Sequence, residues 1–253
     1  MTASTLPAAE AAERRFFRNL AIAWALVITA GFLSNILTGR SSFAAAPIVH
    51  VHAFVFFGWV ALFVAQNVLI AGGNAALHRR LGKLAALWPL LMIGVGLAVM
   101  LESLHRNGGP FVFGAAEFLV SNPLSLITFA ALVYAALAMR RRSDWHRRLM
   151  ICAVVQISGP GFGRLLPAPL LMPYAWQVVQ LVGLVFIFAG MLRDRRQLGR
   201  VHPAWFVGLA AAVGWVALGE AIASTQWAQD MAREVLASGP AANRPMGPYL
   251  PPA

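Results

Sequence analysis

The fold is decided by residues 47–101, which read PIVHVHAFVFFGWVALFVAQNVLIAGGNAALHRRLGKLAALWPLLMIGVGLAVML. Two apolar runs, Val49–Leu69 and Leu81–Leu101, flank a short loop that carries Arg79, Arg80 and, just beyond, Lys83. Each run has about the 20 residues that a helix needs to cross a hydrocarbon core of about 30 Å. The stretch therefore predicts two transmembrane helices joined by a short basic loop.

The same alternation of apolar runs and polar loops continues along the chain. It predicts seven transmembrane helices, over residues 17–37, 49–69, 81–101, 118–139, 149–165, 172–192 and 204–222. Pro160 and several glycines interrupt the end of the fifth run, so this span can be either continuous or broken. A cleaved signal peptide ending near Ala44–Ala46 is the competing interpretation of the first run, but that run exceeds the roughly 7–15 apolar residues of such signals.

The composition is that of a membrane protein. Hydrophobic residues make up 59% of the 253 residues and charged residues 11%, and the mean hydropathy is +0.69. Soluble domains carry about 25% charged residues, so a water-soluble protein is excluded. We expect an all-α integral membrane protein with three parts: a cytoplasmic tail (1–16), a seven-helix domain (17–223), and an interfacial helix with a proline-rich tail (224–253).

The net charge of +11 comes from arginine-rich loops that flank the apolar runs. Fifteen basic residues, within residues 14–18, 79–83, 140–148 and 193–200, fall on one side of the predicted membrane, and five fall on the other. The positive-inside rule assigns the basic side to the cytoplasm of a bacterial inner membrane, with the N-terminus inside and the C-terminus in the periplasm. Charges placed in this way interact with the lipid bilayer, so we expect no nucleic-acid partner.

Histidines are the most informative polar residues, because a single cysteine, Cys152, can form neither an internal disulfide nor a cysteine-based metal site. His50 and His52 diverge by about 200° on a helix, so only one of them can point into the bundle. We favour His52, since His52, Trp59 and Gln66 recur at seven-residue steps and form one stripe. This makes His52 a candidate metal ligand; the alternative is an interfacial histidine above a packing seam.

His78 and His146 have similar surroundings, because each begins a His-Arg-Arg-Leu segment at the start of a predicted helix. Asn74 and Asp144 are the candidate N-caps of these helices. Both imidazoles then lie in a first turn, at one depth on the cytoplasmic side, where the helix dipole favours the neutral form that ligates metals. The arginines that follow can hold carboxylates or phosphates: Arg79, Arg80, Arg147 and Arg148. A pair of topological anchors is the alternative.

Arg164 is predicted to lie near the outer end of the fifth span. An arginine at that depth needs either a partner or a route to the surface. Glu102, Glu117 and His52 are on the same side, so we expect a salt bridge or a water-bridged contact that marks an outer polar site. Snorkelling toward the lipid headgroups is the alternative.

These motifs resemble those of a group of uncharacterised bacterial multipass membrane proteins. The resemblance rests on His52, Trp59 and Gln66, on LHRRLG at 77–82, WHRRLM at 145–150 and GRVHP at 199–203. A more distant likeness is to the two-haem transmembrane b-type cytochromes, in which histidines of helices three and five share one haem. That likeness implies His78 and His146 as axial ligands of a haem b, with the four neighbouring arginines near its propionates.

Three functions remain open from the sequence. The first is a haem- or metal-binding membrane protein of redox type. The second is a small-solute carrier or channel lined by His52, Trp59, Gln66, Asn67, Gln156 and Arg164. The third is an accessory or assembly subunit whose histidine–arginine loops bind a membrane-protein partner or anionic lipid headgroups. The chain carries no hydrolase triad, phosphate-binding loop or paired-carboxylate motif, so an enzyme of those classes is not expected.

Overall fold

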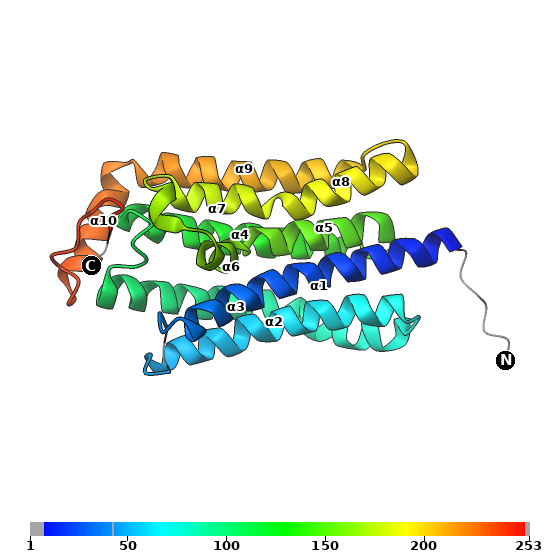
Figure 1. Cartoon of the computed structure of the whole chain (residues 1–253), viewed down its shortest axis with the longest axis horizontal. Helices are drawn as coiled ribbons and strands as arrows, with labels where there is room; N and C mark the ends of the chain where they lie inside the picture. The colour runs from blue at the N-terminus through cyan, green and yellow to red at the C-terminus, as the bar shows by residue number, and fades with distance from the viewer. Residues whose placement is uncertain (1–7, 42, 251–253) are drawn as a thin grey trace.

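A computed structural model describes residues 8–41 and 43–250, and every regular element in this part of the chain is a helix (Figure 1). In chain order these are α1 (Ala8–Leu37), α2 (Pro47–Ala71), α3 (Ala75–Asn107), α4 (Ala115–Ala138), α5 (Ser143–Gln156), α6 (Gly159–Leu165), the 3-10 helix η1 (Ala168–Leu171), α7 (Ala175–Gly183), α8 (Val185–Leu198), α9 (Pro203–Ala223) and α10 (Gln226–Ala237). Six stretches are long and apolar enough to cross a membrane: α1, α2, α3, α4, α7 with α8, and α9. The all-helical membrane class predicted from the sequence is therefore confirmed.

Local sequence signals set several helix ends. The Asn74 side chain caps α3 by accepting a hydrogen bond from the Leu77 backbone N–H (3.1 Å), as predicted. Gly108 ends the same helix in the left-handed conformation (φ 71°). The prediction that Asp144 caps α5 is wrong, because the helix already begins at Ser143 and the N-cap position falls on Arg142. Asp144 lies inside the first turn, and its carboxylate is used elsewhere.

The fifth apolar run is broken into α5 and α6, which answers the question that the sequence left open. The helix stops at Ile157 and Ser158, just before Pro160, whose ring nitrogen has no hydrogen to donate. The Ser158 hydroxyl donates to the Val154 carbonyl (3.0 Å) and accepts from the Trp24 indole (2.7 Å). The break is thus tolerated because buried polar groups around it have partners.

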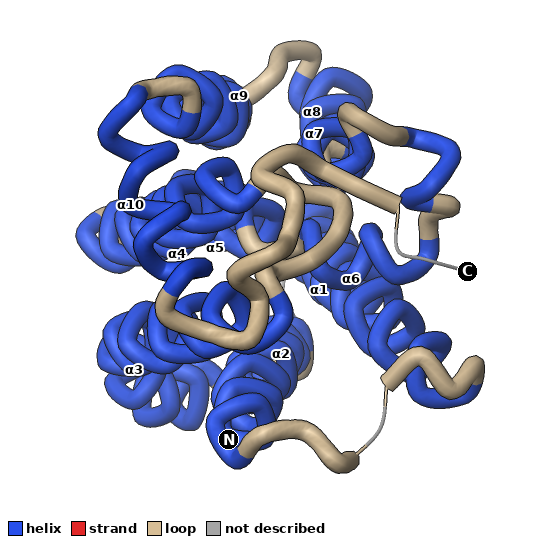
Figure 2. The backbone as a smooth tube through the Cα atoms, turned by 90° about the vertical axis from the view of Figure 1, so that its left-hand side faces the viewer, coloured by secondary structure: helices blue, strands red, loops and turns tan. Residues whose placement is uncertain are grey.

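The helices pack into one bundle whose centre is α4 and α5 (Figure 2). α4 packs against α3, α5 and α9, while α1 packs against α2 and α6. Large buried side chains fill the interior, among them Trp24, Trp59, Phe129 and Trp205. The short helix predicted within residues 224–237 is present as α10, which packs across one end of the bundle against α3, α4 and α9 (Figure 1).

The two ends of the bundle differ in charge. The start of α1 and the α2–α3, α4–α5 and α8–α9 connections lie at one end, on the right in Figure 1, and we call it the basic end. It carries fifteen basic and four acidic residues, whereas the opposite end, with α6 and α10, carries five of each. The whole formal charge of +11 therefore lies at the basic end.

Candidate functional site

The His78 and His146 rings meet at the basic end of the bundle. Their centroids are 6.4 Å apart and their planes are nearly perpendicular, at 87°. His78 comes from the first turn of α3 and His146 from the first turn of α5, while α4 packs against both helices. The sequence predicted that both imidazoles lie at one depth. In the structure they are also neighbours.

His146 is held in one tautomer. Its Nδ1 lies 2.8 Å from the backbone oxygen of Ala136, near the end of α4. A carbonyl oxygen can only accept, so Nδ1 carries the proton and donates it. The Nε2 of the neutral ring is then left with a free lone pair, and it has no hydrogen-bond partner among the described residues. A backbone carbonyl that orients a histidine in this way is typical of metal-ligating imidazoles.

His78 is oriented by Gln66 of α2, whose amide reaches its Nδ1 at 2.6 Å. In the orientation that satisfies both ends of the amide, Nε2 of Gln66 donates to Nδ1 of His78, while the amide oxygen accepts from the Gly82 backbone N–H (2.9 Å). The same amide nitrogen also lies 3.1 Å from the His78 backbone oxygen, so turning the amide over would place oxygen against oxygen and N–H against N–H. Nδ1 of His78 therefore accepts, and Nε2 carries the proton of the neutral ring.

The four neighbouring arginines divide into two pairs. Arg79 and Arg80 are exposed beside His78, with no ion pair among the described residues. Arg147 and Arg148 instead form ion pairs with acidic side chains of other helices. We expected Arg147 and Arg148 to lie near a ligand shared by the histidines. In the structure Glu13 binds Arg147 and Asp194 binds Arg148 instead.

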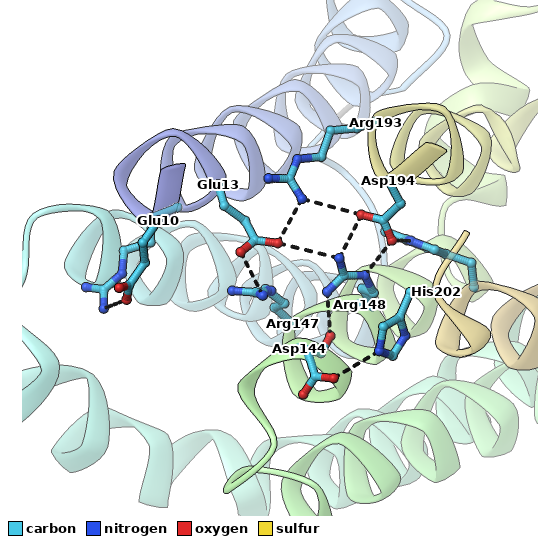
Figure 3. A network of polar contacts seen from close by, with 10 residues as sticks. Glu10, Glu13, Asp144, Arg147, Arg148, Arg193, Asp194 and His202 are labelled. Carbon is cyan, nitrogen blue, oxygen red and sulfur yellow. Dashed lines mark hydrogen bonds and ion pairs between the residues drawn. The ribbon is translucent and has the colours of Figure 1, made fainter. Parts of the chain in front are cut away.

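Arg148 and Asp194 form the centre of a buried ion-pair network (Figure 3). Nε and Nη2 of Arg148 each lie 2.7 Å from one oxygen of the Asp194 carboxylate, and the Trp205 indole donates to the same carboxylate (2.8 Å). Nη1 of Arg148 donates to the backbone oxygen of Asp144 (2.8 Å). The network thus satisfies a charge pair that would be costly in a low-dielectric interior.

Glu13 joins α1 to this network. Its carboxylate lies 2.8 Å from both Arg147 and Arg193 and 3.5 Å from Arg148. The guanidinium groups of Arg147 and Arg148 also lie over the Phe17 ring, at 5.3 and 5.6 Å. α1, α5 and α8 are therefore connected by one carboxylate and three arginines (Figure 3).

His202 connects α9 to the same end of the bundle. Its Nε2 lies 3.0 Å from the Asp144 carboxylate, and its Nδ1 accepts from the Ala204 backbone N–H (3.2 Å), which caps α9. Nε2 must then carry the proton, so it donates to Asp144.

Glu13 and Asp194 are the functional candidates that sequence reasoning missed. Asp194 stands alone in the basic segment Arg193-Asp194-Arg195-Arg196, just after an apolar run. A single carboxylate at that position is a signal for a buried pair. Nothing in the local sequence, however, names Arg148 as its partner.

The residues predicted for an outer polar site are not gathered in one place. In α2, Gln66 contacts His78 at the basic end, and the buried Trp59 has no hydrogen-bond partner for its indole among the described residues. Near the opposite end, His52 stacks on Phe56 with ring centroids 4.1 Å apart. The stripe therefore runs along the helix instead of forming one site.

Arg164 has no salt bridge to a carboxylate in the described part of the chain. Glu102 pairs with Arg106 (3.5 Å), and Glu117 accepts from the Gly114 backbone N–H at the start of α4 (2.7 Å). Neither carboxylate therefore pairs with Arg164, contrary to one form of the prediction. His52, the third predicted neighbour, forms no hydrogen bond with Arg164 among the described residues.

No group of three or more histidine, cysteine, aspartate or glutamate side chains within residues 8–41 and 43–250 is arranged to hold a metal ion. Searches against protein-family models, curated proteins and solved structures find no match to this chain.

Proposed function

We propose that this chain is a redox protein of the bacterial inner membrane that binds a haem b between His78 and His146. The observation that carries the proposal is the geometry of the two imidazoles. Two metal–nitrogen bonds of about 2.0–2.1 Å, with roughly 1 Å from each nitrogen to its ring centre, separate two axial imidazole centres by about 6 Å. The measured separation of 6.4 Å agrees with this value.

The donor set favours haem over a bare metal ion. A tetrahedral zinc or copper site needs a third and a fourth ligand from the protein, and no such group surrounds these histidines in the described residues. A haem brings four nitrogens of its own and needs only two axial ligands. A pair of histidines with no further acidic or sulfur ligand is therefore sufficient for haem.

Other residues of this chain would hold and orient the group. Ala136 accepts from Nδ1 of His146 and so leaves its Nε2 free for iron. His78 would ligate through Nε2 only with its proton moved to Nδ1 and the Gln66 amide turned over. Gly82 lies one turn after His78, and a Cβ there would be in ordinary contact with Gln66 Nε2 at 3.8 Å. Arg79 and Arg80 are the remaining candidates for the propionates. When bound, haem would supply one-electron chemistry at its iron.

The topology that goes with this function has seven crossings. α5, with 14 residues, extends about 21 Å and does not cross the ~30 Å core alone, so a crossing here would also need α6, with 7 residues. The arginine bias then favours a cytoplasmic basic end, with α10 on the periplasmic side. The histidine pair would lie near the cytoplasmic surface.

An absorption spectrum tests the proposal. Protein produced with added haem precursor and purified in detergent is expected to show a Soret band that shifts on reduction with dithionite. His146→Ala and His78→Ala should each lose the band, while the matched control His105→Ala, at the opposite end, should keep it. A colourless wild-type protein, or an unchanged spectrum in both histidine variants, would overturn the proposal and favour the carrier and accessory functions.

A further inference from the structure

Arg164 lies at the end of the bundle opposite to the histidine pair, where α6 contacts α1. Its Nη1 donates to the backbone oxygen of Pro160 (2.7 Å), and its guanidinium lies 4.0 Å from the centroid of Phe32. These contacts use one donor and one face of the group. A guanidinium carries five N–H donors, so most of its hydrogen-bonding capacity remains unused by the described residues.

The parts of α1, α2 and α6 at this end of the bundle contain no carboxylate. Between Glu13 and Glu102, a stretch that includes the rest of α1 and all of α2, the sequence has no aspartate or glutamate, and none occurs between Asp144 and Asp194. Two of the acidic residues at this end have other partners. Glu102 pairs with Arg106, and Glu220 accepts a hydrogen bond from Gln177 (2.6 Å).

Arginine keeps its charge in proteins, so it cannot escape this setting by losing a proton. Among the described residues, no aspartate or glutamate forms an ion pair with Arg164. Its charge is therefore open to an anion from outside the chain.

The depth of the site indicates which anion is available. Phe32 is five residues before the end of α1, and His52 is five residues after the start of α2, which places both about 7–8 Å inside the ends of their helices. That is the region where the side chains of a membrane protein meet lipid headgroups. Phosphate oxygens accept the paired hydrogen bonds that a guanidinium fork donates.

We propose that Arg164, with Phe32 as its platform, binds a phosphate group at the end of the bundle opposite to the basic end. The phosphate can belong to a phospholipid headgroup of that leaflet or to a free anion. The site does not involve His78 or His146, so the proposal stands or falls independently of haem binding.

Native mass spectrometry of the detergent-purified protein, titrated with defined short-chain lipids, tests the site. Wild-type protein is expected to bind phosphatidylglycerol, and diacylglycerol, which lacks the phosphate, should not bind at this site. Arg164→Gln should weaken phosphatidylglycerol binding roughly tenfold, because it removes a charge-assisted hydrogen bond. The matched control Arg106→Gln, at the same end but paired with Glu102, should bind as the wild type does.

Competition with inorganic phosphate distinguishes the two sources. Displacement of the lipid at millimolar phosphate would identify a free anion as a ligand, and retention of the lipid would identify the headgroup. Should Arg164→Gln not fold, Arg164→Lys keeps the charge without the fork and is expected to bind more weakly than the wild type. Equal binding of phosphatidylglycerol and diacylglycerol by the wild type, or equal binding by wild type and both Arg164 variants, would overturn the proposal.

Discussion

Arg148 and Asp194 are 46 residues apart in the sequence and share two hydrogen bonds in the interior of the bundle. Their side chains are only 1% and 0% exposed. The pair links α5 to α8, and Trp205 of α9 donates to the same carboxylate. The contact therefore fixes the relative rotation of three helices beside the histidine pair.

Breaking this pair should destabilise the protein strongly. Asp194→Asn removes the negative charge that pairs with the buried Arg148 guanidinium. The free energy of unfolding should fall by about 3–5 kcal/mol. The double variant Arg148→Met with Asp194→Leu should recover most of that stability, since it removes both charges. The part not recovered would come from the Trp205 indole, which loses its hydrogen-bond acceptor. Thermal unfolding in detergent measures the differences.

The exposed pair of Asp230 and Arg233 serves as the control for that measurement. Its side chains are more than half exposed, so solvent screens the interaction. Asp230→Asn should change the free energy of unfolding by less than about 1 kcal/mol. A loss of similar size for Asp194→Asn would show that the buried network does not hold the helices together.

Gln66 should tune the proposed haem through His78. Gln66→Glu places a carboxylate against Nδ1 of His78, which fixes the proton there and makes Nε2 a stronger electron donor to iron. The reduction potential measured by spectroscopic titration should fall. Gln66→Leu removes the amide that donates to Nδ1 of His78 and lets the ring carry its proton there, so haem affinity should not fall below that of the wild type. If both variants match the wild type in potential and affinity, Gln66 does not act on an iron ligand.

The close crossing of α1 and α6 depends on glycine. A Cβ on Gly161 would lie 3.0 Å from the Cα atom of Ile28, so the two backbones must separate to accept it. Gly161→Ala should therefore lower the free energy of unfolding by about 1–3 kcal/mol. Gly214→Ala is the matched control in α9, because nothing lies within 4 Å of a Cβ there. If Gly161→Ala and Gly214→Ala change the unfolding temperature equally, α1 and α6 can move apart at their crossing without loss of stability.

The topology is open to cysteine labelling in intact cells with a membrane-impermeant maleimide. The native Cys152 is fully buried and should give no background. Cysteine at Ser238, beyond α10, is expected to react, while cysteine at Ala76, in the first turn of α3, should react only after the cells are opened. If the cysteine at Ala76 is labelled in intact cells, the basic end faces the periplasm and the predicted orientation is wrong.

Much of this architecture is determined by the sequence alone, because the signals involved act within one helix or one turn. The apolar runs and the arginine bias predict a membrane bundle with one basic end. Asn74 caps α3 by accepting a hydrogen bond from a residue three positions away. The equal depth of His78 and His146 follows from their places in first turns. Hydropathy and capping need no knowledge of neighbouring helices.

Only the tertiary structure decided which side chains pair across helices. Arg147 and Arg148 directly follow His146, yet helix rotation turns them toward Glu13 and Asp194, whereas Nδ1 of His146 finds the backbone of α4. The contact between Glu13 and Arg193 spans 180 residues. Such partners depend on how the bundle is assembled and on the rotation of each helix, and neither property is written in a local pattern of residues.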